Sequence, residues 1–197
     1  MEDDASQPTP PEEIDLGGDI RILVGPKGSQ KSIKASSHLL AHASPYFKTL
    51  LGPHFQEGSA AAAGKDIVLK DDDPDAFHLL CDILHMRGVV SPEPLRPRVI
   101  LNLAIVSDKY NCTSAMAMAA RSLFPESIAG MAFLELATLT AAAYLLDQFQ
   151  LFKSYTRSMA LSYTESCTSV AIHLGAVPVP LIAWRKSQWS RSPSSGS

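Results

Sequence analysis

The stretch that most constrains the fold is residues 71–88, DDDPDAFHLLCDILHMRG, which carries both a start and an end signal for one helix. Asp73 followed by Pro74 is typical of an N-cap and a first helical residue, and Gly88 predicts the end. Between them, apolar residues recur at i, i+3, i+4 and i+7, namely Phe77, Leu80, Cys81 and Leu84. A helix with one apolar stripe has to cover another apolar surface, so the chain must supply a sheet or further helices beside it.

Strand patterns come before this helix, at residues 19–24 (DIRILV), 31–35 (KSIKA) and 65–70 (KDIVLK). The first two flank a turn rich in glycine and lysine, which predicts a hairpin. After residue 88 the patterns are helical, at residues 98–110, 112–124, 131–146 and 148–163. Early strands followed by helices predict an α+β fold, with a small mixed sheet packed by helices.

Short helices are expected between the second and third strands. Ser36 or Ser37 can cap the first, and Ser44 can cap the second, which starts at Pro45 and ends at Gly52. At the far end of the chain, Asp147 is expected to cap the last helix.

Composition narrows the class of protein. The chain has 197 residues, of which 46% are hydrophobic, and 17 basic side chains face 20 acidic ones. This balance gives no reason to expect a nucleic acid or an anionic membrane as partner, and no apolar run is long enough for a membrane span. Three scattered cysteines indicate reduced thiols and an intracellular protein, in the nucleus or the cytoplasm.

The two ends of the chain differ from the middle. Residues 1–17 are acidic and proline-rich, and we expect a disordered arm that is not a secretory signal. Residues 171–197 are rich in proline, serine and arginine, and we expect a flexible tail. Trp184 and Trp189 lie among basic residues there, but so few positive charges favour no nucleic-acid site.

Motifs for catalysis are weak. GPKGSQKS lacks the glycine before lysine that a phosphate loop needs, so it is interpreted as a turn. His38 and His42 have zinc-ligand spacing, but Leu39 stands where a metalloprotease needs glutamate. The acidic run 71–73 is interpreted as helix capping, and Asp108-Lys109-Tyr110 as a solvated helix end. We predict no catalytic residue, no cofactor and no metal, and keep a metallohydrolase on the two histidines as a hypothesis to be tested.

One loop is unusual. GPHFQEG at 52–58 opens and closes with turn residues, yet places Phe55 where solvent is expected, with Glu57 beyond it. Either Phe55 folds back onto the core with Glu57 solvated, or the pair serves a partner.

In order and spacing, the stretches DIRILVG, SIKASSHLLAHASPYFKTLLGPHFQEG, DIVLKDDDPDAFHLLCDILHMRG and LNLAIVSDKYNC resemble the BTB/POZ domain. The resemblance covers residues 18–124, and its details are similar to the fungal branch. It implies that residues 125–170 form a C-terminal helical extension. It also implies a non-enzymatic module that binds proteins and forms homodimers, and that in many members is a substrate adaptor for cullin-3 ubiquitin ligases.

The resemblance also assigns residues. Phe55, Gln56 and Glu57 match the hydrophobic-any-glutamate motif of cullin-binding members, and Tyr110 falls where cullin contacts are made. A hydrophobic anchor beside a directional charge is a reasonable docking element.

The dimer features of the family are incomplete. Asp19 is present at the first strand, but Ser36 and Ser37 stand where many members have a histidine and a basic residue. A dimer face is therefore expected at Asp19, with Leu39 and Leu40 as another surface for it. The competing hypothesis is a self-assembly module of a transcription or chromatin complex that binds no cullin.

Overall fold

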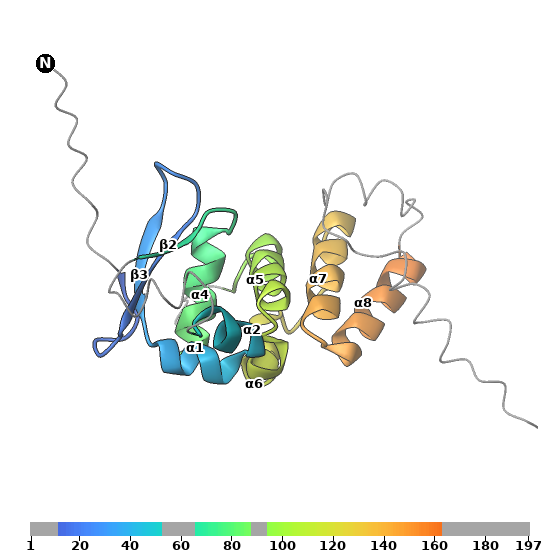
Figure 1. Ribbon diagram of the computed structural model, residues 1–197. Helices are drawn as coiled ribbons and strands as arrows, with labels where there is room; N and C mark the ends of the chain where they lie inside the picture. Colours follow the sequence, from blue (N-terminus) through green and yellow to red (C-terminus); the bar gives the residue numbers. More distant parts are fainter. Residues whose placement is uncertain (1–11, 53–65, 88–93, 163–197) are drawn as a thin grey trace, which may run out of the picture.

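The structure is a computed structural model that describes residues 12–52, 66–87 and 94–162 (Figure 1). It is elongated: the sheet lies at one end, a cluster of helices fills the middle, and the last two helices lie at the other end. Within the described residues no helix is both long and apolar enough to cross a membrane.

The sheet is small and mixed, as predicted. Its strands are β1 (Glu12–Glu13), β2 (Ile20–Val24), β3 (Lys31–Ala35) and β4 (Ile67–Leu69), in the order β1-β3-β2-β4. β2 and β3 form the expected antiparallel hairpin, whereas β1 runs parallel to β3 and β4 parallel to β2.

The first strand corrects the prediction of a disordered arm over residues 1–17. Residues 12–17 belong to the fold, because Glu12 and Glu13 pair with β3 and Ile14 is 6% exposed in the core. A lone buried isoleucine inside an acidic, proline-rich stretch gives no periodic signal, so the pattern could not identify it. Residues 1–11 lie outside the described part.

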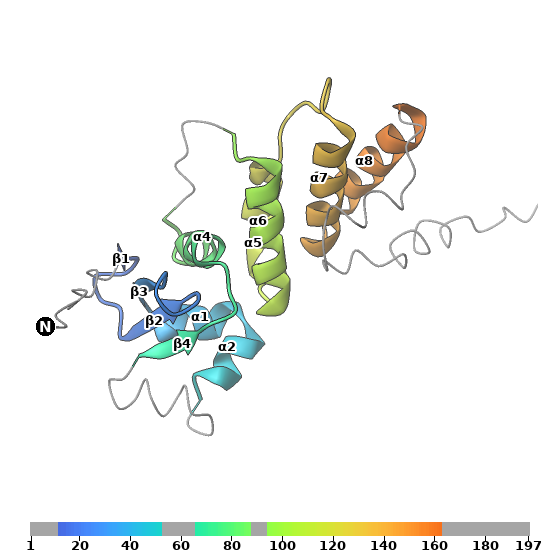
Figure 2. The same cartoon turned by 90° about the horizontal axis from the view of Figure 1, so that it is seen from above.

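The helices follow the predicted order. They are α1 (Ser37–Ala43), α2 (Pro45–Leu50), α4 (Pro74–Leu84), α5 (Pro97–Lys109), α6 (Thr113–Leu123), α7 (Phe133–Leu145) and α8 (Phe149–Ser162). Viewed from above, α4 lies over the sheet, and α5 lies between α4 and the pair α7–α8 (Figure 2). The α+β class and the helical region beyond residue 124 agree with the sequence.

The N-caps were predicted well because they are local. Ser36 accepts a hydrogen bond from the Leu39 N–H, and Ser44 accepts one from the Phe47 N–H. Asp73 accepts one from the Ala76 N–H at 2.8 Å, with Pro74 as the first helical residue. These bonds satisfy backbone donors that have no partner inside the helix.

The predicted helix ends were less accurate. The C-cap of α2 is Leu51 at φ −84°, and Gly52 is not left-handed. α4 already ends at Leu84, before Gly88, which lies outside the described residues. Asp147 is not the N-cap of α8, because that helix begins at Phe149 and the Phe152 N–H makes the first helical bond, to the Gln148 carbonyl.

Three helices end instead in the same left-handed turn. Met86 (φ 57°), Asn111 (φ 51°) and Asp147 (φ 53°) follow α4, α5 and α7. In each case the next N–H reaches back to a carbonyl five residues earlier: Arg87 to Asp82, Cys112 to Ser107 and Gln148 to Ala143. This is the Schellman arrangement, which usually uses glycine. The ends of α5 and α7 lie within one residue of the predicted ones, and only the end of α4 was placed too late, at the glycine that follows its left-handed turn.

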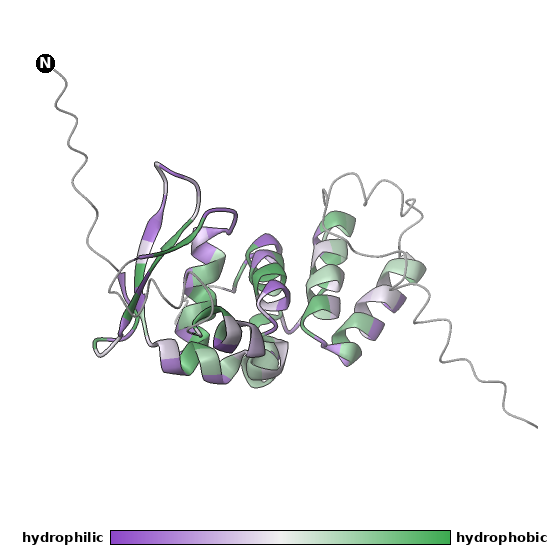
Figure 3. Ribbon diagram, in the orientation of Figure 1, coloured by the Kyte–Doolittle hydropathy of each residue, from purple (hydrophilic) through white to green (hydrophobic). Residues whose placement is uncertain are grey.

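One apolar core runs from the sheet to α8. The inner residues of the strands, the stripe of α4 and most of α5 and α7 belong to it. α7 is apolar along most of its length, as its colour shows (Figure 3), because it is covered by α5 on one side and α8 on the other. The stripe predicted for α4 is confirmed, since Phe77, Leu80, Cys81 and Leu84 are all buried.

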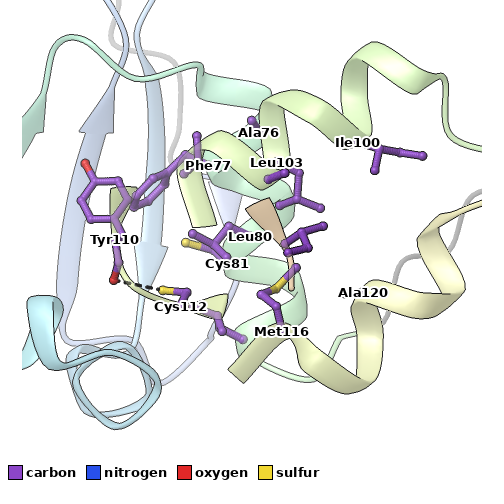
Figure 4. Packing of buried hydrophobic residues seen from close by; sticks show 14 of the residues in the cluster. Ala76, Phe77, Leu80, Cys81, Ile100, Leu103, Tyr110, Cys112, Met116 and Ala120 are labelled. Atoms are coloured by element: carbon purple, nitrogen blue, oxygen red, sulfur yellow. Dashed lines mark hydrogen bonds between the residues drawn. The ribbon is translucent and has the colours of Figure 1, made fainter. Parts of the chain in front are cut away.

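Two buried thiols lie in this core. Cys81 and Cys112 are both 0% exposed (Figure 4). Burial raises the pKa of the Cys112 thiol to about 11, and burial also raises the pKa of Cys81 well above its ordinary value of 9.0. Both thiols therefore behave as small apolar groups.

We predict that Met86→Gly stabilises the chain by about 0.5–1 kcal/mol, because it removes a left-handed side chain at little cost in packing. Met86 is 85% exposed and loses few contacts. The matched control is Met118→Gly in the interior of α6, where the side chain is 95% exposed. This change should destabilise the chain by about 1 kcal/mol. Urea unfolding of both variants gives the comparison, and equal losses would contradict the assignment of strain to Met86.

We also predict that stability falls above pH 9. A folded pKa above the unfolded value means that the folded chain keeps a proton that the unfolded chain releases. Stability is then full below the unfolded pKa of 9.0 and decreases as the pH rises towards the folded value. Between pH 8 and 10, the two thiols together should cost about 2–3 kcal/mol.

The measurement is urea unfolding across this range in reducing buffer, with Cys81→Ala/Cys112→Ala as control. The substitutions lower stability at every pH through lost packing, but they should flatten the slope. An unchanged slope would show that other groups cause the alkaline loss.

Candidate functional site

The site is centred on Tyr110, which directly follows α5. Its side chain is 1% exposed and its ring stacks on Phe47 with centroids 4.7 Å apart. Phe77 of α4 meets the ring edge-on at 5.5 Å, and the two lie together in Figure 4. Tyr46 meets it at 5.3 Å from the outer side. The ring therefore joins α2, α4 and α5 at one corner.

The Tyr110 hydroxyl ends in a buried polar contact. It donates to Asp72 Oδ2 at 2.6 Å, and Lys109 Nζ donates to Asp72 Oδ1 at 2.7 Å. The Asp72 side chain is only 4% exposed, so its charge needs both partners. Burial, and then the hydrogen bond to Asp72, raise the pKa of Tyr110 far above its ordinary value. The hydroxyl therefore stays protonated and remains a donor.

Backbone groups of Tyr110 tie the corner to α2. Its carbonyl accepts a hydrogen bond from Ser44 Oγ and a weaker one from Cys112 Sγ at 3.5 Å. The same Ser44 oxygen accepts from the Phe47 N–H at 3.1 Å, which caps α2. The start of α2 is thus fixed to the end of α5.

This corner corrects two interpretations. Asp108-Lys109-Tyr110 is not a solvated helix end, because Tyr110 is buried and Lys109 holds a buried carboxylate. The acidic run also does more than cap, since Asp73 caps α4 while Asp72 faces inward. The sequence offered one signal: of the adjacent carboxylates, only one can be the N-cap, which leaves Asp72 unassigned.

The outer layer of the corner is accessible. Tyr46 is 44% exposed although it touches the buried Tyr110 ring. Sequence reasoning missed it, because alternation within a six-residue helix is too short to show which face is outside. We call Tyr46, Lys109 and Tyr110 the α2–α5 corner.

The predicted docking motif cannot be located. Phe55, Gln56 and Glu57 lie outside the described residues, which resume at Asp66 before β4. Because Tyr110 is buried, it exposes little surface that a partner could contact directly. Its ring instead supports the exposed Tyr46.

The two leucines expected at a dimer face differ in their exposure to solvent. Leu40 is 0% exposed and belongs to the core, so it is not part of an exposed surface, whereas Leu39 is half-buried. Helical geometry explains the difference, because Leu40 points towards the core side of α1.

Asp19 has an internal partner in place of the missing basic residue. It accepts hydrogen bonds from the Ser37 N–H at 2.7 Å and from Ser37 Oγ at 2.5 Å. Burial by itself raises the pKa of Asp19, but these bonds outweigh it and lower the pKa. The carboxylate is thus satisfied within the chain.

The histidine pair shows no metal geometry. His38 and His42 are both exposed on α1, and the described residues contain no group of three or more potential ligands that could hold a metal ion. The turn at residues 25–30 joins β2 to β3, as expected of a hairpin.

Comparison with known proteins gives a clear family match. The family model described as "BTB/POZ domain" matches residues 16–124, which is more than half of the chain. No curated protein matches the chain. The matched region contains β2, β3 and β4, the α2–α5 corner and α6, and it ends between α6 and α7, whereas β1 lies before it.

We predict that the Asp72–Tyr110 contact couples the two residues. Tyr110→Phe should destabilise the chain by about 1–2 kcal/mol, because it removes a donor from a buried carboxylate, and Asp72→Asn should cost at least as much. The double variant should lose less stability than the sum of the two single losses, by about 1 kcal/mol or more. Urea unfolding of the four proteins gives the coupling. Additive losses would show that the contact contributes nothing of its own.

Proposed function

The chain belongs to the BTB/POZ domain family, a family of protein-interaction modules, and from this premise we propose that it is a homodimerising substrate adaptor for a cullin-3 ubiquitin ligase. Protein partners follow from the family. The cullin, the dimer and an intracellular location are the parts that we propose.

The observation that carries the proposal is the α2–α5 corner. A docking surface needs a rigid base, since ordering a loose one on binding costs affinity. Stacked rings, the Asp72 carboxylate and the Ser44 bond hold this base without help from a partner. An exposed Tyr46 lies on this base, and the Phe55-Gln56-Glu57 motif follows α2 in the sequence.

The chemistry suits a partner that offers an apolar pocket and a positive charge. Phe55 would fill the pocket, because truncation of a central aromatic anchor is typically costly at protein interfaces. Glu57 would orient the encounter with a basic residue of the partner. Tyr46 would add apolar area beside them, supported from below by Tyr110.

For the homodimer, Asp19 and Leu39 remain the proposed face. Asp19 is already hydrogen-bonded to Ser37. A dimer contact at this place would therefore use the outer surface of Asp19 and Ser37, and would not form a new buried ion pair. Leu39 contributes only part of its side chain.

The test is calorimetric titration of the full chain with a cullin-3 N-terminal domain. We expect wild type to bind with micromolar or tighter affinity. Phe55→Ala/Glu57→Ala should weaken binding about thirtyfold or more, because an anchor of this kind is worth about 2 kcal/mol. Tyr110→Phe should leave the affinity nearly unchanged, because the ring that supports Tyr46 is kept.

A matched control is Phe149→Ala on α8. This aromatic is 63% exposed and lies at the opposite end of the molecule from the sheet (Figure 1). It should bind like wild type. If folded wild type does not bind cullin-3 at all, the adaptor proposal fails and the self-assembly hypothesis takes its place. That hypothesis predicts that the chain sediments as an oligomer in analytical ultracentrifugation.

A further inference from the structure

A second surface lies at the sheet edge, away from the α2–α5 corner. Glu12 and Glu13 pair in register with Ile33 and Lys34 of β3, and Figure 2 shows β1 at this edge next to α4. The Ile14 N–H continues the pairing with a bond of 3.0 Å to the Lys34 carbonyl. We call residues 12–14 the strap.

The strap lies among basic side chains that come from separate elements. Glu12 contacts His78 Nε2 at 2.7 Å and Lys31 Nζ at 3.5 Å. Glu13 contacts Lys34 Nζ at 3.5 Å, and its carbonyl accepts from Arg87 Nη1 at 3.0 Å. Two consecutive carboxylates thus meet bases from β3 and from the polar face of α4, and the Glu13 carbonyl meets a base from the turn after α4.

Three of these bases have further acidic partners. Asp75 binds Lys31 at 2.8 Å, and Asp82 lies 3.1 Å from His78 Nδ1 and 3.4 Å from Arg87. These three bases therefore have contacts that do not depend on the strap, and such contacts favour a preorganised binding site.

The third position of the strap is apolar. Ile14 is 6% exposed, while Glu12 and Glu13 are both exposed at the surface. The β3 edge beside α4 thus accepts an extended segment with two acidic residues followed by an aliphatic one. Ladder bonds supply affinity and the alternating contacts supply selectivity, as in strand addition at a sheet edge.

The strap is weakly held for a structural element. β1 has only two residues, and exposed ion pairs of this kind contribute little each. Pro10 and Pro11 precede it, and proline has no N–H to extend a ladder. A partner segment with longer strand character could form more ladder bonds with β3 than the strap does.

We propose that the β3 edge, with the basic side chains of β3 and α4 beside it, is a docking site for an extended acidic segment of a partner protein. The partner segment carries two adjacent acidic residues followed by an aliphatic residue, and the strap of this chain occupies the site as an internal stand-in. The site uses none of the residues of the α2–α5 corner, so it stands whether or not cullin-3 binds.

The experiment measures binding of a fluorescent peptide, PTPPEEIDLGG (residues 8–18), to the full chain by anisotropy. The receptor is Glu12→Ala/Glu13→Ala/Ile14→Ala, in which the strap no longer competes. We expect this variant to bind at least about tenfold more tightly than wild type, because the internal competitor is lost. Adding Lys31→Glu/Lys34→Glu should abolish binding, and a peptide with both glutamates replaced by glutamine should bind at least about tenfold more weakly.

Circular dichroism shows which variants fold. If the triple variant does not fold, Glu12→Lys/Glu13→Lys keeps Ile14 in the core and should still bind the peptide better than wild type. A folded receptor that ignores the peptide, or wild type that binds it equally well, would overturn the proposal. A wild-type dimer that Glu12→Lys/Glu13→Lys converts to monomer would also overturn it, since the strap would then belong to a second copy.

Discussion

The buried carboxylate of Asp72 is the contact on which the middle of the molecule depends. An ionised group inside a core is costly unless it is paired. Asp72 can therefore be buried only where hydrogen-bond donors lie beside its carboxylate. Both donors come from the end of α5, while Asp72 itself precedes α4. The pair of bonds therefore fixes how these helices meet, and the neighbouring Asp73 adds a contact to Asn102 of α5 at 3.0 Å.

Local features of the fold were accessible from the sequence. Ser36, Ser44 and Asp73 act within their own first turn, so the residues that show the signal are those that form the bond. The stripe of α4 follows from periodicity alone. The end of α4 was harder to place, because Met86 adopts a left-handed conformation that its residue type does not favour.

The candidate site was less predictable for a different reason. Whether Tyr110 is buried depends on Phe47 and Phe77, which lie far from it in sequence, and no pattern within one segment reports such a contact. The same holds for the strap. In the sequence its acidic residues are typical of a solvated arm, and only the fold shows that bases of β3 and α4 lie beside them. The family resemblance assigned Tyr110 to a partner interface, but it did not indicate that the Tyr110 hydroxyl faces inward.

α4 links the two surfaces. Its start is tied to Asp72 and the α2–α5 corner, its apolar stripe holds the core, and its polar face carries His78 and Asp82 towards the strap. Asp75, in the first turn of the same helix, also binds Lys31 beside the strap, so the two surfaces share the length of α4. Because the stripe anchors the whole length of the helix, occupation of one surface need not distort the other. The adaptor role that we propose would require this arrangement, since an adaptor holds a ligase and a client at the same time.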